Sequence, residues 1–546
     1  MEIKNKIRRF VRDINQWSFW TIAIGLFIAL PIFSIVLNLF GQAGPMWEHV
    51  CEHLLSAYVY NSIFLLLGTG TLSILIGVSS AWIISQYDFP YRKIIERLLF
   101  LPLAIPSYIV AYAYVGFFGN SGLLQRLLSL VGITEVAIDM MNIYGLIWVL
   151  SLSLFPYVYI STRMAFLNQS SCIQDAAFLL GASQKKYFRT VALPLAQPAI
   201  VAGVFLVFME VLNDFGAAKY YGVNTFTTGI FRTWTALEDL KTAFYLSAIL
   251  IFLVFVLRMF EKIQRGKKSY TIPIDSHKGS TKDRIQLSGK KKIAYIGILC
   301  IPIFFGLLLP LVQLFYWAYL TFYQVFKLEL WWITLQSCGI ALMTAACTVV
   351  GAISLIYFSQ WNHLKSLTIF SKMATIGYVI PGAIIGIGVM AVSQVFVDVA
   401  YDNFQLKIGY IVYGSSIVLV YAYVVRFLAV AYNPLEANVL KVGRYLAESS
   451  YLLGKTSLRT LLKIELPLLK IGLSSAFTLV FIDTLKELPL TLILKPYKVQ
   501  TLAVKAYEYA DNEQVAEAAL PALLLIGIVL FFMLIVQRWE AKLDQE

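Results

Sequence analysis

Long apolar runs recur along the whole 546-residue chain and are separated by short polar or charged stretches. A helix needs about 20 predominantly apolar residues to cross the hydrocarbon core of a bilayer. Twelve runs have roughly this length, at residues 17–41, 60–86, 97–119, 143–163, 194–214, 241–260, 293–322, 332–358, 368–395, 409–431, 467–488 and 516–537. Because backbone groups in lipid must be hydrogen-bonded internally, the pattern predicts an all-α polytopic membrane protein with twelve transmembrane helices.

The composition agrees with this class. Hydrophobic residues make up 59% of the chain and charged residues 14%, against about 25% charged residues in a typical soluble domain. The first apolar run follows K-N-K-I-R-R, is too long for the core of a signal peptide and lacks a small-residue cleavage site. We therefore expect the first run to be retained as a span. The five cysteines form no C-x-x-C pair and suggest no disulfide framework.

The distribution of basic residues predicts the orientation. The net charge is +13, from 44 Lys and Arg against 31 Asp and Glu. Placing the N-terminus inside also places the basic stretches 92–97, 185–189 and 261–292 inside, whereas the outer stretch 120–142 is poorer in Lys and Arg. Cytoplasmic loops of membrane proteins carry such an excess. Both termini are therefore predicted to be cytoplasmic.

The sequence carries an internal repeat with a shift of half its length. Residues 175–194 read D-A-A-F-L-L-G-A-S-Q-K-K-Y-F-R-T-V-A-L-P, and residues 448–467 read E-S-S-Y-L-L-G-K-T-S-L-R-T-L-L-K-I-E-L-P. Both begin with an acid, reach the glycine of L-L-G six residues later and end on L-P. The shift of 273 residues continues without a gap over about sixty residues, which unrelated helical segments would not show.

The repeat divides the chain into three parts. We expect a first six-helix repeat at 1–260, a basic cytoplasmic linker at 261–292 and a second six-helix repeat at 293–546. Because each repeat has an even number of spans, the two repeats run parallel and predict a pseudo-twofold axis along the membrane normal. The linker holds ten basic and three acidic residues with few large apolar ones, which is typical of a flexible segment.

The repeated segment has the properties of a contact surface. Each copy falls between the fourth and fifth spans of its half, on the predicted cytoplasmic side. An acid favours a helix start, small residues permit close approach, and glycine ends a helix readily. The predicted contact residues are Asp175, Ala176, Ala177 and Gly181 in the first copy and Glu448, Ser449, Ser450 and Gly454 in the second.

This segment resembles the E-A-A---G---------I-x-L-P loop of ABC-transporter permeases. Asp175 replaces Glu and Val191 replaces Ile in the first copy, and Ser449 and Ser450 replace the alanines in the second. The resemblance implies a type I ABC importer fold. It also implies that each loop forms a coupling helix, which docks on a homodimeric P-loop ATPase at the cytoplasmic side.

The chain is not expected to bind ATP itself. Residues 454–456 read G-K-T, like the end of a phosphate-binding P-loop, but that motif needs a glycine at the position of Ser449. No G-x-x-x-x-G-K-[ST] sequence occurs anywhere in the chain. We therefore expect no cofactor on this chain and no enzymatic activity, with ATP and Mg²⁺ bound by the partner ATPase.

Two pairs of acids lie at the ends of apolar runs. Glu210 and Asp214 recur at the 273-residue shift as Asp483 and Glu487. Residues four apart share a helix face, and a rise of 1.5 Å per residue puts the first pair roughly 24–30 Å beyond Pro194. The acids then lie in the outer part of the span or at its mouth. The predicted axis would gather all four into a ring.

Three interpretations of these carboxylates stay open, because ionisable residues inside a span are functional candidates by default. Carboxylate oxygens are hard ligands, so the acids would suit a hard cation that passes through the gate. They could instead close a gate through hydrogen bonds and salt bridges, for example with Lys486 or Lys219. The third interpretation is that they are merely solvated at the outer interface.

The sequence around the acids resembles fused ferric-iron permeases. Residues 210–234 read E-V-L-N-D-F-G-A-A-K-Y-Y-G-V-N-T-F-T-T-G-I-F-R-T-W, and residues 483–510 read D-T-L-K-E-L-P-L-T-L-I-L-K-P-Y-K-V-Q-T-L-A-V-K-A-Y-E-Y-A. The resemblance implies a bacterial inner-membrane permease that receives Fe³⁺ from a periplasmic binding protein. With Fe³⁺ as the cation, the first interpretation makes Glu210, Asp214, Asp483 and Glu487 candidates for transient contact with it.

Two alternatives share parts of this pattern. Fused permeases for thiamine or another organic cation have the same architecture. An ion-coupled secondary transporter would use the acids as proton or cation sites, although it needs no docking loop. Arg426 is predicted near the inner end of the tenth run, where we expect it to snorkel toward the membrane surface.

Overall fold

The computed structural model describes residues 16–119, 122–130, 132, 138–265, 284–361, 371, 375–443 and 445–543. This part of the chain contains nine helices that are long and apolar enough to cross a membrane, or up to eleven if two bent helix pairs each count as one span. A shorter apolar helix covers Ala519–Ile535. Each of the twelve predicted runs coincides with one of these helices or pairs, which supports the all-α polytopic class. The start of the run at 368–395 and residues 266–283 of the linker lie outside the described residues.

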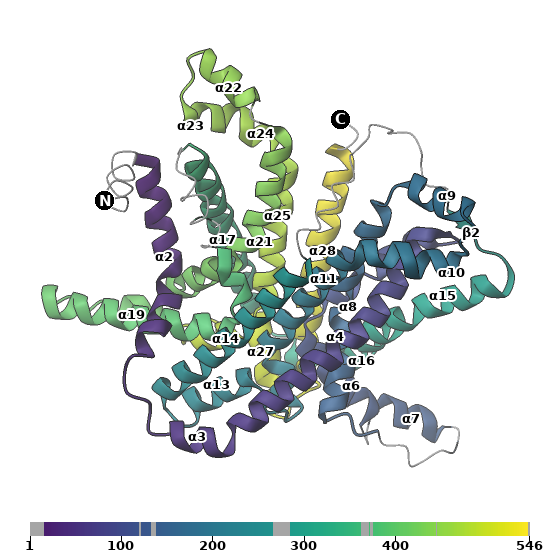
Figure 1. Cartoon of the computed structure of the whole chain (residues 1–546). Helices are drawn as coiled ribbons and strands as arrows, with labels where there is room; N and C mark the ends of the chain where they lie inside the picture. Colours follow the sequence, from purple (N-terminus) through teal and green to yellow (C-terminus); the bar gives the residue numbers. More distant parts are fainter. Residues whose placement is uncertain are drawn as a thin grey trace. The chain divides into compact units, whose positions relative to one another are not determined.

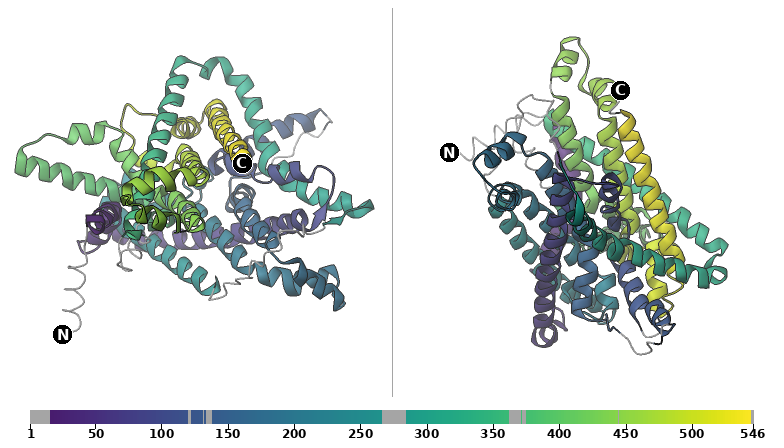
Figure 2. Two further views of the ribbon diagram at one scale, coloured as in Figure 1. Left: turned by 90° about the horizontal axis from the view of Figure 1, so that it is seen from above. Right: turned by 90° about the vertical axis from the view of Figure 1, so that its right-hand side faces the viewer.

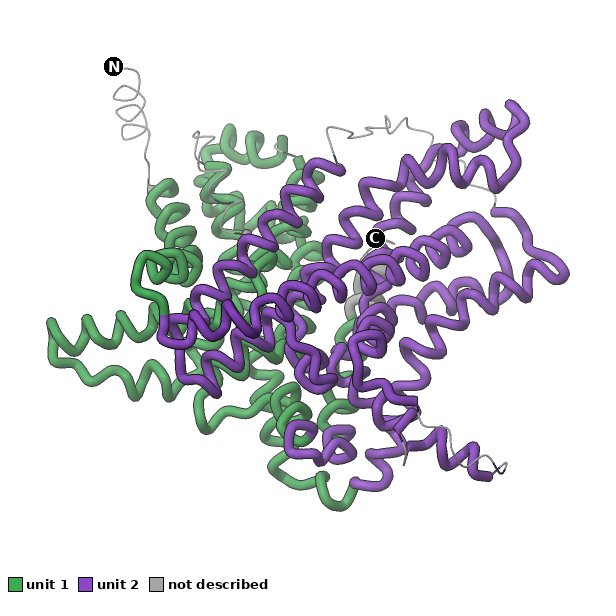
Figure 3. Tube along the Cα trace, turned by 60° about the horizontal axis from the view of Figure 1, so that its bottom comes forward, with its two compact units in different colours: residues 1–43, 322–509, 520–546 green, residues 44–321, 510–519 purple. Residues whose placement is uncertain are grey.

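The chain forms two compact units (Figure 3). Unit 1 comprises residues 1–43, 322–509 and 520–546, and unit 2 comprises residues 44–321 and 510–519. The helices found mainly in unit 1 are α2 (Gln16–Asn38), α17 (Leu328–Gln360), α19 (Gly382–Phe404), α20 (Gly409–Gly414), α21 (Ile417–Val442), α22 (Tyr445–Leu452), α23 (Ser457–Thr460), α24 (Leu466–Leu468), α25 (Lys470–Lys486), α26 (Pro489–Leu494), α27 (Leu502–Asp511) and α28 (Ala519–Leu543). A 3₁₀ segment covers Thr375–Val379, and a π-helical segment covers Leu461–Glu465.

Unit 2 holds the remaining elements. They are α3 (Trp47–His53), α4 (Leu55–Gln86), β1 (Tyr87–Asp88), α5 (Arg92–Leu98), α6 (Ser107–Phe118), α7 (Leu123–Ser129), α8 (Ile143–Leu167), α9 (Ser171–Leu179), α10 (Gln184–Tyr187), α11 (Leu193–Asn213), α12 (Gly216–Tyr220), α13 (Phe226–Thr235), α14 (Leu240–Arg265), β2 (Ile285–Gln286), α15 (Gly289–Ile303) and most of α16 (Leu309–Val325). A 3₁₀ turn covers Leu101–Ala104, and π-helical segments cover Phe188–Ala192 and Phe304–Leu308. The two strands pair in parallel, with Tyr87 opposite Ile285 and Asp88 opposite Gln286.

Helices of unit 2 approach closely where a glycine of α4 or α11 faces Val158 of α8. An added Cβ at Gly77 of α4 would lie 2.9 Å from Val158 Cβ of α8. An added Cβ at Gly203 of α11 would lie 2.8 Å from Val158 Cα. In lipid, where no hydrophobic effect drives helices together, such contacts let van der Waals packing hold them. Buried residues of α4, α8 and α11 form the core of this unit.

The first helix of each repeat packs among helices of the other repeat. In unit 1, α2 runs beside α17 and α19 (Figures 1 and 2), and Ser34 Oγ of α2 donates to the carbonyl of Gly388 at 3.1 Å. In unit 2, α15 packs on α4, and Tyr114 of α6 donates from its hydroxyl to the carbonyl of Phe305 at 2.8 Å. The compact units therefore differ from the two sequence repeats, because each unit includes the first span of the other repeat.

Candidate coupling surface and buried carboxylates

The first copy of the repeated segment forms two short helices joined by a glycine turn. Ser170 caps α9 by accepting a hydrogen bond from the amide of Cys172. Gly181 follows α9 with φ +78°, a conformation that glycine adopts without strain. Ser183 then caps α10 by accepting from the amide of Lys186. The glycine is therefore the break predicted from sequence.

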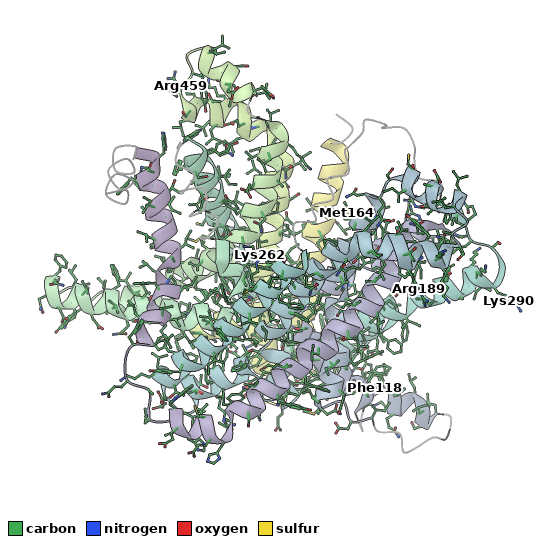
Figure 4. All side chains as sticks on the ribbon, in the orientation of Figure 1. Phe118, Met164, Arg189, Lys262, Lys290 and Arg459 are labelled. Atoms are coloured by element: carbon green, nitrogen blue, oxygen red, sulfur yellow. The ribbon has the colours of Figure 1, made fainter. Side chains whose placement is uncertain are left out.

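The second copy repeats this backbone at the predicted shift. Gly454 follows α22 with φ +73°, and α23 begins three residues later. A π-helical segment lies near the end of each copy, at Phe188–Ala192 and at Leu461–Glu465, again 273 residues apart. The duplicated loop is thus a duplicated structure. Figure 4 labels Arg459 of α23 in the lobe that α22 and α23 form.

The two acids of the motif occupy different turns. Glu448 lies in the first turn of α22, as predicted. Asp175 is the fifth residue of α9, beyond the first turn, so the prediction that it lies near a helix start is wrong for the first copy. The helix begins at Ser171 because the Ser170 side chain, rather than the acid, satisfies the free amide there. Both acids are exposed.

Each loop presents two exposed leucines beside its glycine. Leu179 and Leu180 are 89% and 88% exposed, and Leu452 and Leu453 are 89% and 79% exposed. An adjacent pair of large, exposed apolar side chains beside an acid and small residues makes each loop a candidate for a protein contact. In the sequence, L-L-G serves only as a landmark for the spacing of the repeat. The pair of leucines recurs in both copies, directly before the glycine that forms the turn. This recurrence could have identified the leucines as candidate contact residues.

Each loop is braced internally, by different means. In the first copy, the ring of Phe178 packs on Tyr187 with centroids 5.5 Å apart. In the second copy, the hydroxyls of Ser450 and Thr460 share a hydrogen bond of 2.9 Å. These contacts hold the first short helix of each loop against the second.

Asp214 ends the helix that carries Glu210. It is the C-cap of α11, with φ −65° and ψ 122°, and only 9% of it is exposed. Its carboxylate accepts from the Ser107 hydroxyl at 2.5 Å and from the amides of Ala217 and Ala218 at 3.0 and 3.1 Å. The carboxylate therefore fixes the start of α12 and ties it to the start of α6.

Glu487 has the matching position in the second repeat. It is the C-cap of α25, with φ −69° and ψ 121°, and it is 6% exposed. Its carboxylate accepts from the amide of Leu490 at 3.1 Å and pairs with Arg426, whose Nε lies 3.3 Å from Oε2. The second carboxylate is thus compensated by a cation, whereas neutral donors hold Asp214.

Arg426 corrects a prediction. It was expected to snorkel from the inner end of a span, but it is 4% exposed and lies about 14 Å along α21 from Ile417. The helix extends to Val442, well beyond the apolar run at 409–431, so Arg426 lies deep in the span. A charge at that depth is costly unless it is paired, and Glu487 supplies the pair.

The other two acids are less buried. Glu210 lies on the last turn of α11 and is half-buried. Asp483 lies 3.5 Å from the Nζ of Lys486, with about a quarter of its side chain exposed (24%). Both residues lie on α25, three positions apart, so this salt bridge does not connect two elements across a gate. Lys219 pairs with Asp511 at 2.7 Å. In the part of the chain that the structure describes, no three His, Cys, Asp or Glu side chains gather in a group that could hold a metal ion.

Gly382 leaves room for the buried ion pair. An added Cβ there would lie 2.4 Å from Arg426 Nη1 and 2.5 Å from Glu487 Oε1. We expect Gly382→Val to destabilise the folded protein by about 1–3 kcal/mol and to lower its melting temperature in detergent, because the pair must move. Gly339→Val is the matched control, since a Cβ at Gly339 meets no described atom within 4 Å. Equal melting temperatures for the two variants would count against this packing.

The comparisons with known proteins agree with these features. Residues 73–268 match the family described as binding-protein-dependent transport system inner membrane component. The chain is 25% identical over 534 residues to the Fe(3+)-transport system permease protein FbpB 2 of Haemophilus influenzae, covering 94% of this chain and 96% of that protein. It is 26% identical over 225 residues to the sulfate transport system permease protein CysW of Escherichia coli K12, covering 40% of this chain and 76% of that protein. It is 29% identical over 163 residues to the molybdenum transport system permease protein ModB of the same strain, covering 29% and 69%.

Together, the fold, the duplicated loop and these matches define the chain as a multi-pass transport permease of the inner membrane, and not an enzyme. Residues 73–268 match the binding-protein-dependent permease family, and nearly the whole chain is similar to an Fe(3+)-transport permease. A permease of this family works with a periplasmic binding protein and an ATPase. The ion-coupled secondary transporter considered from sequence is therefore not supported.

Proposed function

We propose that this chain moves ferric iron, delivered by a periplasmic binding protein, into the cytoplasm. The observation that carries the proposal is the likeness to an Fe(3+)-transport permease over 94% of this chain and 96% of that protein. The sulfate and molybdenum permeases match much shorter parts of the chain. Likeness over both repeats favours ferric iron over thiamine or another organic cation.

We further propose that the two glycine-turn loops are the docking points of a homodimeric P-loop ATPase. One leucine pair on each loop, at positions 273 residues apart, offers one contact to each ATPase subunit. The docking residues would also include the eight positions of the motif. ATP and Mg²⁺ would bind to that partner, and this chain would need no cofactor of its own. Both loops and both termini would then be cytoplasmic, as the basic residues predict.

The proposed organisation follows the sequence repeat, with repeats at 1–260 and 293–546 and a linker at 261–292. Closure of the ATPase would pull the two loops, and the braced short helices would pass the movement to α11 and α25. Each of these helices ends at a buried carboxylate cap. The loaded binding protein must favour one state of the permease over the other for this cycle to import substrate.

We propose different roles for the four carboxylates, all of which are candidates for transient contact with Fe³⁺. Asp214 and Glu487 are buried and bonded to neighbouring helix starts, so they suit the gate itself. Glu210 and Asp483 keep part of their surface exposed, so they suit contact with a passing hard cation. In each repeat the partly exposed acid and the buried acid are four residues apart at the end of the same helix. A cation that contacts the first acid would therefore act on the helix end that the second acid holds.

Amide substitution tests this assignment. In proteoliposomes that contain the permease, its ATPase and its binding protein, we expect the variant Glu210→Gln with Asp483→Asn to take up ferric iron about tenfold more slowly. Its assembly with the ATPase should not change, because neither residue lies in a coupling loop. Neither the wild-type permease nor the double variant should take up thiamine. Unchanged iron uptake in the variant would remove these two acids from the pathway, and thiamine uptake would refute the substrate assignment.

A further inference from the structure

A cavity lies beside the first coupling loop, at the end of unit 2 where α9, α10, β2 and the start of α15 meet (Figure 1). Its volume is about 510 Å³. Its walls come from the end of α4, from α10 and the π segment after it, and from the segment that leads into α15. The lining residues are Trp82, Tyr87, Gln184, Lys185, Phe188, Ile285, Gln286, Leu287, Ser288, Lys291 and Tyr295.

The walls of this cavity are cationic. Lys185 and Lys291 enter it from opposite elements, and no Asp or Glu is among its lining residues. Neither lysine forms an ion pair with any residue that the structure describes. Further basic residues surround the cavity, and Figure 4 labels two of them, Arg189 and Lys290, at this end of unit 2. The partial positive charge at the start of α15 adds to theirs, so an anion is the ligand that these walls favour.

The acid next to Tyr87 in the chain is already paired. Asp88 follows Tyr87 on β1, lies 3.5 Å from Arg92 Nε and accepts a hydrogen bond from Gln286 Nε2 at 2.8 Å. Arg284 lies close enough to Arg92 and Asp88 for the charges to interact. Burial, together with the Arg92 charge, lowers the pKa of Arg284. Asp88 is therefore engaged by Arg92 and Gln286 and does not line the cavity with Lys185 and Lys291.

Aromatic and apolar side chains continue the cavity toward the hydrocarbon region. The rings of Tyr87 and Tyr295 pack with centroids 5.1 Å apart. Burial raises the pKa of Tyr87 to about 12, so its hydroxyl stays a hydrogen-bond donor near neutral pH. Beyond Tyr295, Ile298 and Ile301 of α15 and Phe304 of the π-helical segment that follows are 42%, 53% and 50% exposed. Lys291 and Ile298, seven residues apart, lie on the same side of the helix, and the other two continue from Ile298 in steps of three residues.

This sequence of cation, aromatic ring and apolar stripe matches a phospholipid lying along a helix. We propose that the cavity binds the headgroup of an anionic phospholipid, such as phosphatidylglycerol, with its acyl chains along Ile298 and Ile301 of α15 and Phe304 of the π-helical segment that follows it. The phosphodiester would lie between Lys185 and Lys291. This lipid site goes beyond substrate transport and does not depend on which substrate the permease carries.

The site would be particular to the first repeat. At the 273-residue shift, Leu355 stands at the position of Trp82, Gln360 at that of Tyr87 and Leu458 at that of Lys185. Because Gln184, Lys185 and Phe188 belong to the first coupling loop, a bound lipid would connect that loop to α15. The lipid would thereby stabilise one of the two loops and leave the other unaffected.

Thermal melting of the purified full-length permease in a neutral detergent tests the proposal. We expect phosphatidylglycerol to raise the melting temperature by about 2–5 °C, and phosphatidylcholine to change it little. Lys185→Ala with Lys291→Ala should lose this shift. Both lysines are exposed, so the variant should fold. The matched control, Lys463→Ala with Lys470→Ala, removes two exposed lysines from the second repeat and should keep the shift.

Three results would overturn the proposal. One is an equal shift with phosphatidylglycerol in the wild type and the Lys185/Lys291 variant. Another is an equal shift with phosphatidylcholine, which would show that the headgroup charge does not matter. The third is the full shift with inorganic phosphate or glycerol phosphate alone, because the ligand would then be a free phosphate and not a lipid. The test uses no transport readout, so it can fail while the proposed function stands.

Discussion

Replacing the four exposed leucines of the coupling loops with serine is expected to abolish assembly with the ATPase. The residues are Leu179, Leu180, Leu452 and Leu453. Burying one leucine side chain contributes about 1.5–3 kcal/mol, so losing two per loop should reduce ATPase recovery at least about a hundredfold. The measurement is the native mass of the affinity-purified complex. The wild type should carry two ATPase copies, and the variant should carry none.

Three matched variants make this result specific. Leucine to methionine at the same four positions keeps the apolar contact and should keep both ATPase copies. Leu406→Ser removes a leucine that is 53% exposed and lies outside the loops, and it should also keep them. A serine pair in one loop only should weaken assembly less than serines in both. Two ATPase copies on the four-serine variant would refute docking through these side chains.

Arg426→Ala is expected to be the most destabilising single substitution considered for this chain. It would leave the Glu487 carboxylate buried without its cation, and breaking a buried pair on one side costs about 3–5 kcal/mol. We expect a large fall in melting temperature or in the yield of folded protein, measured by fluorescence-detected gel filtration after heating. Wild-type melting of the variant would contradict the pairing.

A double variant separates stability from transport. Arg426→Met with Glu487→Leu replaces both charges by apolar side chains, and such replacements of buried pairs are often neutral or stabilising. We expect its melting temperature to recover above that of Arg426→Ala. We expect its iron uptake to stay low, because the cap at the start of α26 and the charge at the gate are both lost. A double variant that melts no better than Arg426→Ala would show that the pair does not explain the loss.

Local patterns in the sequence predicted a large part of the fold. Apolar length predicted the spans, and the 273-residue shift predicted that Gly454 would repeat the turn at Gly181, as the φ angles confirm. Such features follow from neighbouring residues alone. The packing of each repeat's first span in the other repeat's unit does not follow from neighbouring residues. Ser34 of α2 bonds to Gly388, which is far away in the chain, and no local sequence pattern connects the two residues.

The roles of the buried acids needed the structure for the same reason. From sequence, Asp214 and Glu487 are only acids at the ends of apolar runs. Whether they face a pathway or cap a helix depends on Ser107 and Arg426, which are distant in the chain. Arg426 was misplaced because α21 continues past its apolar run through polar residues to Val442, so hydropathy put the end of the span too early.

ATPase activity in proteoliposomes tests the central claim most directly. The permease and its ATPase are reconstituted together, and the binding protein is added empty, loaded with Fe³⁺ or exposed to thiamine. We predict that only the Fe³⁺-loaded binding protein stimulates ATP hydrolysis and drives iron into the vesicles, and that the four-serine variant of the coupling loops shows neither effect. Equal stimulation by the empty protein, stimulation by thiamine, or iron uptake without the ATPase would contradict the account.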